Sequence, residues 1–345
     1  MAATLKDVAK KAGVSPATVS RVMNGNPRIS EKTRKIVLEC AQALDYRINA
    51  LARGLKTNRT YTVGFLCPDI SNNFFMSVAK GVEEFLRHSG YSLLVCDSGD
   101  TVSGEKERLR LLIEKSIDGL ILIPATGNGK HYHRVRQENI PIVLVDRLVE
   151  GFTADAVLAD NINGTCAVVT RILEDHPDAH IGFIGGDMRL TSARERYEGF
   201  CIAFANCNRA VEEGLVRFGD FHEDSGHALM QQLMELPMPP DAVFVSNYFM
   251  HVGAARYLME KWDREGVSIR PRVRIAGFDN MELSFLLGFS DMTAEQPTVD
   301  IGRRAAQQLL KRMQGDLASP PVILRAKTRL RRLHAQGRLI SGTRI

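Results

Sequence analysis

The sequence predicts a small all-α helix-turn-helix domain followed by an α/β domain with two lobes. Three observations predict this fold class: helical spacing of apolar residues in the first 45 residues, alternation of short apolar strands with helical stretches from Tyr61, and division of that alternation into two sets. A chain of 345 residues is also too long for one hydrophobic core.

The first predicted helix follows Thr4, which is placed to cap it. Asp7, three residues later, completes a capping-box pattern. Gly13 supplies the tight backbone turn that ends the helix. Four apolar residues recur at helical spacing and form one face: Leu5, Val8, Ala9 and Ala12.

A second helix begins after the turn, with Ser15 as its cap and Pro16 at its first position. The spacing directs three apolar residues inward: Val19, Val22 and Met23. The outward residues are Pro16, Ala17, Ser20, Arg21 and Asn24. A short helix with small side chains, an Arg and an Asn on its free face fits the DNA major groove.

A third helix is predicted from Ser30 to about Asp45, and it completes a three-helix bundle. Its predicted buried stripe consists of Ile36, Val37, Cys40, Ala41 and Leu44. The segment 49–56 that follows has two interpretations. It is either a linker with two stray leucines, or a hinge helix that orders only on DNA and inserts Leu55 into the minor groove.

The charge is concentrated in the N-terminal part. Residues 1–60 hold twelve Lys and Arg against four acids, a net charge of +8. The rest holds 33 basic and 36 acidic residues, a net charge of −3, which gives +5 for the chain. Basic charge on one small unit favours nucleic-acid binding by that unit.

The sequence does not indicate a membrane protein, a secreted protein or a metalloprotein. The chain has no run of eighteen apolar residues and no visible signal peptide. Six scattered cysteines without C-x-x-C suggest buried thiols in a reducing cytoplasm, and neither a metal site nor a cofactor is predicted. We interpret His131 and His133 as a surface pair. Three acids are interpreted as loop or helix-start residues: Asp97, Asp100 and Glu105.

From Tyr61, apolar strands alternate with amphipathic helices, which predicts parallel sheets covered on both faces. The first set has strands at 63–67, 93–96, 120–123 and 142–145, with helices at 75–89, 105–115 and 131–139. The second has strands at 181–184, 242–245 and 273–276, with helices at 164–174, 193–206, 225–236 and 251–265. Ligands bind beyond the carboxyl ends of such strands, so the cleft between the lobes is the expected small-molecule site.

Motifs along the whole chain resemble those of the lac repressor (LacI/GalR) family of bacterial transcription regulators. The most specific is D-V-A-x-x-A-G-V-S-x-x-T-V-S-R-V-x-N at Asp7–Asn24, and A-R-G-L-K at Ala52–Lys56 resembles the family's hinge helix. Further segments keep the family's order and spacing: V-G-F-L-C-P-D-I-S-N-N-F-F (63–75), D-G-L-I-L-I-P (118–124), P-I-V-L-V-D-R (141–147), A-R-E-R-Y-E-G-F (193–200), P-D-A-V-F-V-S-N (240–247) and A-G-F-D-N (276–280).

The resemblance implies a helix-turn-helix DNA-binding domain (1–47), a hinge and linker (48–60), and a periplasmic-binding-protein-like effector and dimerisation domain (61–345). It implies a cytoplasmic homodimer on a palindromic double-stranded operator, most often a repressor of carbohydrate-metabolism genes. The chain ends at RLISGTRI without the extra leucine-rich helix of tetrameric members, so a dimer is expected. Whether the effector releases DNA or promotes binding stays open.

The resemblance places base reading on Pro16, Ala17 and Arg21, and Arg21 is the strongest candidate because an Arg can bond guanine O6 and N7 together. Ser15, Thr18, Ser20 and Asn24 are placed for phosphate contacts, with Thr18 equally interpretable as a capping residue. The remaining DNA-contact candidates are Thr4, Asn49, Ala52, Leu55 and Lys56.

The resemblance places a sugar-type effector on Asp69, Phe74, Phe75, Asp146, Arg147, Arg196, Asn247, Asp279 and Gln296. The presence of Arg147 directly after Asp146 resembles the sequences of the fructose and sucrose regulators. Two arginines in one cleft favour an anionic sugar phosphate or sugar acid, and the alternative is that Arg147 pairs with a nearby acid. Tyr248 stands where the family usually has Asp. This difference weakens the assignment of a specific neutral sugar from better-known family members to this protein.

Three other classes of protein fit the sequence less well. A sugar-transport binding protein shares the two-lobed fold but needs a signal peptide and lacks a basic N-terminal unit. An enzyme is not expected, because the chain has no G-x-G-x-x-G, P-loop or G-x-S-x-G motif. A DNA-architecture protein without a ligand does not explain the two-lobed part.

Overall fold

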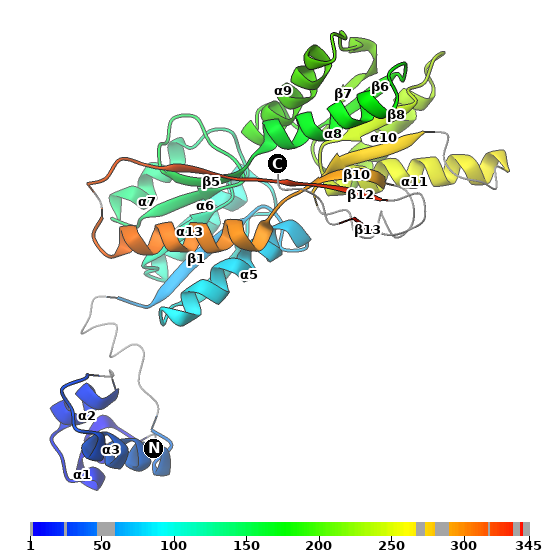
Figure 1. The fold of residues 1–345 in the computed structure, drawn as a ribbon. Helices are drawn as coiled ribbons and strands as arrows, with labels where there is room; N and C mark the ends of the chain where they lie inside the picture. The colour runs from blue at the N-terminus through cyan, green and yellow to red at the C-terminus, as the bar shows by residue number, and fades with distance from the viewer. Residues whose placement is uncertain are drawn as a thin grey trace. The chain divides into compact units, whose positions relative to one another are not determined.

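The computed structural model describes residues 3–23, 26–46, 59–266, 273–279, 290–316, 318–333 and 339–340. The chain divides into two compact units, Met1–Tyr61 and Thr62–Ile345 (Figure 1). No helix in the described ranges is long and apolar enough to cross a membrane.

The N-terminal unit contains α1 (Leu5–Ala12), α2 (Pro16–Met23) and α3 (Glu31–Ala43). Both hydrogen bonds of the predicted capping box between Thr4 and Asp7 are present, and Gly13 ends α1 at φ +66°. The three helices enclose one small core: Val8, Ala9, Val19, Val22, Val37 and Ala41. One predicted core residue is wrong, because Ile36 is 39% exposed beside the buried Val37.

The first lobe of the larger unit is a six-stranded sheet in the order β11-β5-β4-β3-β1-β2, with every neighbouring pair parallel. Its strands are β1 (Thr62–Cys67), β2 (Ser92–Asp97), β3 (Gly119–Leu122), β4 (Ile142–Val145), β5 (Asp155–Ala159) and β11 (Ile323–Ala326). Its helices are α5 (Asn73–His88), α6 (Val102–Glu114), α7 (His133–Gln137) and α13 (Thr298–Met313), with the short η1 (Lys130–Tyr132).

Two glycines let α5 and α13 approach closely, and these helices lie side by side in Figure 1. A Cβ at Gly81 would lie 2.1 Å from the carbonyl oxygen of Val299, and one at Gly302 would lie 2.0 Å from that of Val78. Because no side chain fits at either position, helix α13 can seat on α5 only with these residue types.

The second lobe is a seven-stranded sheet in the order β13-β12-β10-β9-β8-β6-β7. Its strands are β6 (Ile181–Gly185), β7 (Val216–Phe218), β8 (Ala242–Val245), β9 (Arg274–Phe278), β10 (Ser290–Glu295), β12 (Arg329–Leu333) and β13 (Leu339–Ile340). The pairs of β12 with β10 and β13 are antiparallel and the others are parallel. Its helices are α8 (Asn161–Asp175), α9 (Thr191–Asn206), α10 (Glu223–Met234) and α11 (Tyr248–Glu265), with the short η2 (Glu213–Leu215).

Within the described residues, the chain passes between the lobes three times: after β5, after β10 and between β11 and β12 (Figure 1). The predicted strands and helices before residue 276 are confirmed within a few residues of their bounds. The sequence interpretation missed β5 and β7, and it assigned nothing after residue 276. It therefore missed that α13 and β11 return to the first lobe and that β12 joins the second.

The cysteines are less buried than predicted. Only Cys67 is buried, and the other five are partly exposed: Cys40, Cys96, Cys166, Cys201 and Cys207. All six are free thiols. Burial at the end of β1 raises the pKa of Cys67 to about 12, so this thiol stays protonated and unreactive.

His251 in α11 is completely buried, and neither ring nitrogen has a hydrogen-bond partner among the described residues. Burial lowers its pKa to about 3. Below the ordinary histidine pKa, His251 is therefore protonated in the unfolded chain but stays neutral in the folded chain. The free energy of unfolding falls as the pH drops below that ordinary pKa.

We expect His251→Leu to remove that loss. Relative to the variant, the unaltered protein should lose about 1.4 kcal/mol of unfolding free energy between about pH 7.5 and about pH 5.5. Urea unfolding followed by fluorescence of Trp262, the single tryptophan, measures it within the same helix. A variant that replaces the exposed His88 with Leu controls for loss of an imidazole, and equal pH dependence with and without His251 would contradict the prediction.

Candidate functional site

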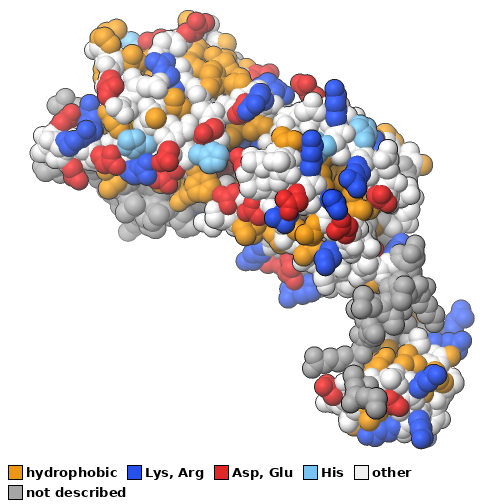
Figure 2. Space-filling model, turned by 180° about the vertical axis from the view of Figure 1, so that it is seen from behind, with side chains coloured by type: hydrophobic (Ala, Val, Ile, Leu, Met, Phe, Trp, Pro, Cys, Tyr) orange, Lys and Arg blue, Asp and Glu red, His pale blue; other side chains and the backbone are white. Residues whose placement is uncertain are grey.

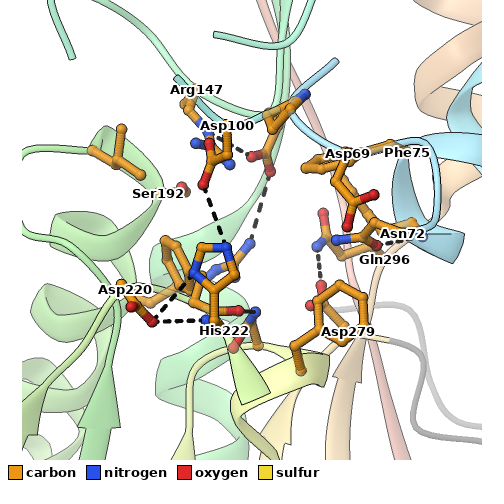
Figure 3. A pocket seen from close by; sticks show the side chains of 18 residues that line it. Asp69, Asn72, Phe75, Asp100, Arg147, Ser192, Asp220, His222, Asp279 and Gln296 are labelled. Carbon is orange, nitrogen blue, oxygen red and sulfur yellow. Dashed lines mark hydrogen bonds and ion pairs between the residues drawn. The ribbon is translucent and has the colours of Figure 1, made fainter. Parts of the chain in front are cut away.

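A pocket lies between the two lobes and is lined from both (Figure 3). It contains about 660 Å³ of space, part of it open to solvent. All nine residues predicted from the sequence line it. Nine further residues also line it: Pro68, Asn72, Asp100, Leu190, Ser192, Asp220, Phe221, His222 and Phe249.

Strand ends place most of the polar side chains. Asp69, Asp146 and Asn247 follow β1, β4 and β8, and Asp279 and Gln296 follow β9 and β10. The carboxyl ends of these parallel strands face the space between the sheets, as expected for α/β proteins. Phe74 and Phe75 begin α5, and their rings pack edge to face.

Arg196 of α9 is the buried cation at the back of the pocket, with 3% of its surface exposed. Its Nε donates to Asn161 Oδ1 at 3.0 Å, and its Nη1 donates to the backbone oxygen of Ser246 at 2.6 Å. Its guanidinium lies 4.1 Å from the ring centroid of Phe278. Nη2 lies 3.9 Å from Asp146 Oδ1, so this ion pair spans the two lobes.

Arg147 is paired with its neighbour Asp146, with 3.0 Å between Nε and Oδ2. The structure therefore contains the pairing that the sequence left as an alternative to an anionic ligand. Asp146 accepts from one arginine and lies beside the other, so one carboxylate offsets part of the charge of both.

Asp279 and Gln296 form a buried pair at the ends of β9 and β10. Gln296 Nε2 donates to Asp279 Oδ1, and the Tyr248 backbone N–H donates to Oδ2 at 3.0 Å. Burial raises the pKa of Asp279 above its usual range. Gln296 Oε1 is buried without a hydrogen-bond partner among the described residues, which leaves one acceptor in the pocket unsatisfied.

Two predicted residues form hydrogen bonds with neighbouring parts of the chain. Asn247 caps α11 through Met250 N–H, and its amide donates to the Phe221 backbone oxygen at 2.9 Å. Asp69 accepts from the Ser71 N–H at 2.7 Å and from its hydroxyl at 2.8 Å. Both side chains line the pocket with oxygens that already serve neighbouring groups.

The most informative omissions are Asp100 and His222, which face each other from opposite lobes (Figure 3). His222 Nε2 lies 3.8 Å from Asp100 Oδ2, and Nδ1 lies 3.4 Å from Asp220. Asp100 is a loop acid, as predicted, but it also lines the pocket. Asp220 and His222 lie in the loop after β7. Because β7 was not predicted, these residues could not be recognised as following the end of a strand.

Four pocket residues other than glycine have left-handed backbone angles: Asp100 (φ 51°), Asp146 (φ 70°), Phe221 (φ 72°) and Asp279 (φ 88°). Such conformations cost free energy and persist where the surrounding structure imposes them, often at ligand sites.

Other predicted polar residues lie elsewhere. His131 is less exposed than a surface pair implies, with 14% of its side chain accessible, and its Nε2 is 2.6 Å from the buried Glu105 Oε1, which also accepts from Tyr132 at 2.8 Å. Glu105 lies in the first turn of α6 but is fully buried, so it is more than a helix-start acid. His133 is hydrogen-bonded to Gly151, and Asp97 binds the Ile70 N–H. Among the described residues, no cluster of His, Cys, Asp and Glu is suited to a metal ion.

In the N-terminal unit, α2 exposes Pro16, Ala17 and Arg21 together while Val19 and Val22 are buried. Ser20, on the same helix, is partly exposed. Figure 2 shows Lys and Arg side chains on the surface of this unit. The candidates Asn24, Asn49, Ala52, Leu55 and Lys56 lie outside the described residues.

The capping groups of this unit are engaged. Ser15 accepts from the Thr18 N–H at 3.1 Å, and the two hydroxyls are 2.9 Å apart. Thr18 thus has a local partner at the start of α2, in line with the capping interpretation. Thr4 is exposed, but its hydroxyl donates to Asp7 at 2.7 Å.

The sequence matches two family models, one over most of each unit. Residues 4–49 match the bacterial regulatory proteins of the lacI family. Residues 60–334 match the periplasmic binding proteins and sugar binding domain of the LacI family. This chain belongs to the LacI family. It is therefore a ligand-responsive DNA-binding transcriptional repressor and not an enzyme.

Curated relatives of the LacI family match over nearly their full length. The HTH-type transcriptional repressor PurR of Vibrio campbellii is 32% identical over 313 residues, covering 90% of this chain and 92% of that protein. The repressor CytR of Escherichia coli K12 is 31% identical over 335 residues, covering 95% and 97%. These relatives do not single out the fructose and sucrose branch that Arg147 suggested.

Solved structures show the same fold. A complex of the transcriptional regulator CelR with cellobiose is 27% identical with a TM-score of 0.69, covering 95% of this chain and 98% of that one. The lac repressor dimer bound to operator is 22% identical with a TM-score of 0.78, covering 95% and 98%. The two-lobed α/β architecture predicted from the sequence is thereby confirmed.

Proposed function

We propose that this LacI-family repressor binds a palindromic operator as a homodimer in the cytoplasm and controls carbohydrate-metabolism genes in response to a sugar-type effector. In this proposal residues 1–47 read DNA, residues 48–60 form the hinge, and the pocket between the lobes binds the effector. A ligand that prefers one lobe arrangement shifts the DNA-binding population by a coupling of typically about 1–3 kcal/mol.

The main support for a sugar-type effector is the set of residues that line the pocket. Carboxylates and amides lie beside aromatic rings, and Gln296 Oε1 is a buried acceptor that lacks a donor among the described residues. Hydroxyl groups of a sugar supply such donors, and the faces of Phe74 and Phe75 can cover an apolar ring face. The similar regulator CelR forms a complex with cellobiose, which supports this class by analogy.

The charges of the pocket favour a neutral effector over a sugar phosphate or sugar acid. Five aspartates line it against two arginines, and Arg147 is already paired with Asp146. A pocket with this excess of carboxylates repels an anion. The anionic alternative keeps one supporting observation, because Arg147 bonds Asp146 through its Nε and a guanidinium carries two further nitrogen donors.

Thermal unfolding with a ligand panel tests the effector proposal. A ligand that binds only the folded protein at about one hundred times its Kd adds about 2.7 kcal/mol of stability. We expect a midpoint shift with D-ribose or cellobiose that exceeds the shift with fructose 1-phosphate. A shift with fructose 1-phosphate alone would establish the anionic alternative, and a shift with adenosine alone would replace the sugar class by nucleosides.

Gln296→Met should remove about half of the stabilisation that a binding sugar produces at about one hundred times its Kd, because it removes the buried acceptor while keeping the side-chain length. The expected loss of affinity is about tenfold, the effect of one unsatisfied hydrogen bond. Gln231→Met, on an exposed face of α10, serves as the matched control. Unchanged affinity in Gln296→Met would remove this oxygen from the proposed site.

Arg21→Ala tests base reading by α2. Arg21 is exposed on the face of α2 that carries Pro16 and Ala17. We expect a loss of roughly 1–3 kcal/mol of discrimination at one base pair per half-site. Competition between operator variants selected from random inverted repeats measures it. An equal loss on every sequence would assign Arg21 to a phosphate contact.

A further inference from the structure

A chain of hydrogen bonds runs behind the pocket and reaches strand β11. Arg325 of β11 donates from Nη2 to Glu195 Oε1 at 2.6 Å and from Nη1 to Oε2 at 3.0 Å. Glu195 precedes Arg196 on α9, is 8% exposed and does not line the pocket. This bidentate pair joins a strand of the first lobe to a helix of the second.

Asn161 links Glu195 to the cation of the pocket. Its Nδ2 donates to Glu195 Oε2 at 2.8 Å, and its Oδ1 accepts from Arg196 Nε at 3.0 Å. Asn161 is fully buried at the start of α8, where the chain first passes from one lobe to the other.

The two neighbours fix the direction of the Asn161 amide. A guanidinium only donates hydrogen bonds and a carboxylate only accepts them. Turning the amide over would set Nδ2 against Arg196 Nε and Oδ1 against the Glu195 carboxylate. Both bonds would be lost in a buried place, where unsatisfied polar groups are costly. The carboxylate of Glu195 therefore determines the acceptor that Arg196 meets.

The far end of Arg196 returns to the first lobe. Its Nη1 is held by the Ser246 backbone oxygen, and its Nη2 lies beside Asp146 after β4. The complete chain of contacts thus leaves the first lobe at Arg325 and comes back to it at Asp146. Its two lobe-to-lobe contacts lie at the connecting strand and at the pocket.

We propose that Glu195 and Arg325 are positioning residues, which hold Arg196 through Asn161 and thereby couple the pocket to the strand that connects the lobes. The importance of Arg196 for the effector rests on the proposed function. The positioning itself is a property of the protein without ligand, so it is testable on its own.

Hydrogen exchange of the Arg196 Nε–H tests the proposal in the full-length protein labelled with ¹⁵N-arginine. The resonance is assigned by its absence in Arg196→Lys. We expect Glu195→Met to speed exchange of this proton roughly two- to tenfold, because the Asn161 amide loses the partner that orients it. Arg325→Met should act in the same direction with a smaller factor, since Glu195 then keeps Asn161 but loses its cation.

Glu198→Met is the matched control, because Glu198 is exposed on the same helix and makes no hydrogen bond with the described residues. It should leave the Arg196 signal unchanged. Unchanged exchange in a folded Glu195→Met protein overturns the proposal. If that variant does not fold, Arg325→Met decides, because the Arg325 side chain is 38% exposed and its replacement keeps the bond between Asn161 and Glu195. Failure of every sugar to bind would contradict the proposed function without altering this result.

Discussion

Arg312→Met is expected to destabilise the protein by about 3–5 kcal/mol, because it leaves a buried carboxylate without its cation. Arg312 of α13 bonds Asp155 of β5 through Nε at 2.6 Å and through Nη2 at 2.9 Å. The two residues are 7% and 3% exposed. The same guanidinium also holds three backbone oxygens of the following turn: those of Asp316, Ser319 and Pro320.

The acid dependence of this pair has a defined sign. Burial alone would raise the pKa of Asp155, but hydrogen bonds from Arg312 and from the Val322 N–H hold the pKa below its ordinary value. The stabilisation is therefore present above the ordinary aspartate pKa and is lost as the pH falls from that value through the lower pKa of the folded state. The penalty for Arg312→Met should shrink in acid, where the unpaired carboxyl becomes protonated.

A double-mutant cycle with Asp155→Asn isolates the pair. The double variant should be more stable than the sum of the two single losses predicts, because each single change already removes the ion pair. Urea unfolding supplies the four free energies. Arg304→Met, on the same helix but with a partly exposed side chain, is the matched control. Additive losses, or a loss in Arg312→Met no larger than in the control, would show that the pair contributes little.

Removal of residues 1–59 is expected to abolish operator binding and to leave effector affinity largely intact. The two units are separately compact, and every residue that lines the pocket lies in the larger one. Specific binding of proteins to DNA is typically about 10³–10⁷ times tighter than non-specific binding, so the loss is large.

The measurement uses inverted-repeat DNA selected with the full-length protein, and the truncated protein is titrated onto it at several salt concentrations. Its affinity for the sugar identified in the thermal panel is measured in parallel. Arg21→Ala serves as the comparison, because it alters discrimination while keeping the basic unit. Loss of sugar binding in the truncated protein would refute the independence of the two units.

The parts of the fold that could be predicted are those whose signals are local. The bundle is fixed by apolar spacing, by Thr4 and Ser15 as caps and by the turn at Gly13, all within a few residues of one another. The buried strands of the two sheets stand out as apolar runs. Since pocket residues follow such strands, Asp146 and Asp279 could be found from the sequence together with the family resemblance.

The parts that could not be predicted depend on contacts between distant residues. Strand β5 begins with Asp155, whose burial makes sense only beside Arg312, 157 residues later. Strand β11 has mostly exposed side chains and joins the sheet only through β5. The third contact of this kind, between His222 and Asp100, requires both lobes to be in place.

The return of α13 and β11 to the first lobe has a consequence during protein synthesis. A ribosome makes the polypeptide from its N-terminus, yet the first sheet lacks its β11 edge until residue 326 has emerged. Until then the free edge of β5 and the face of α5 that packs against α13 are open to other nascent chains. A ribosome that stalls before α13 therefore releases a product with both lobes incomplete, and its exposed surface is a target for chaperones and proteases.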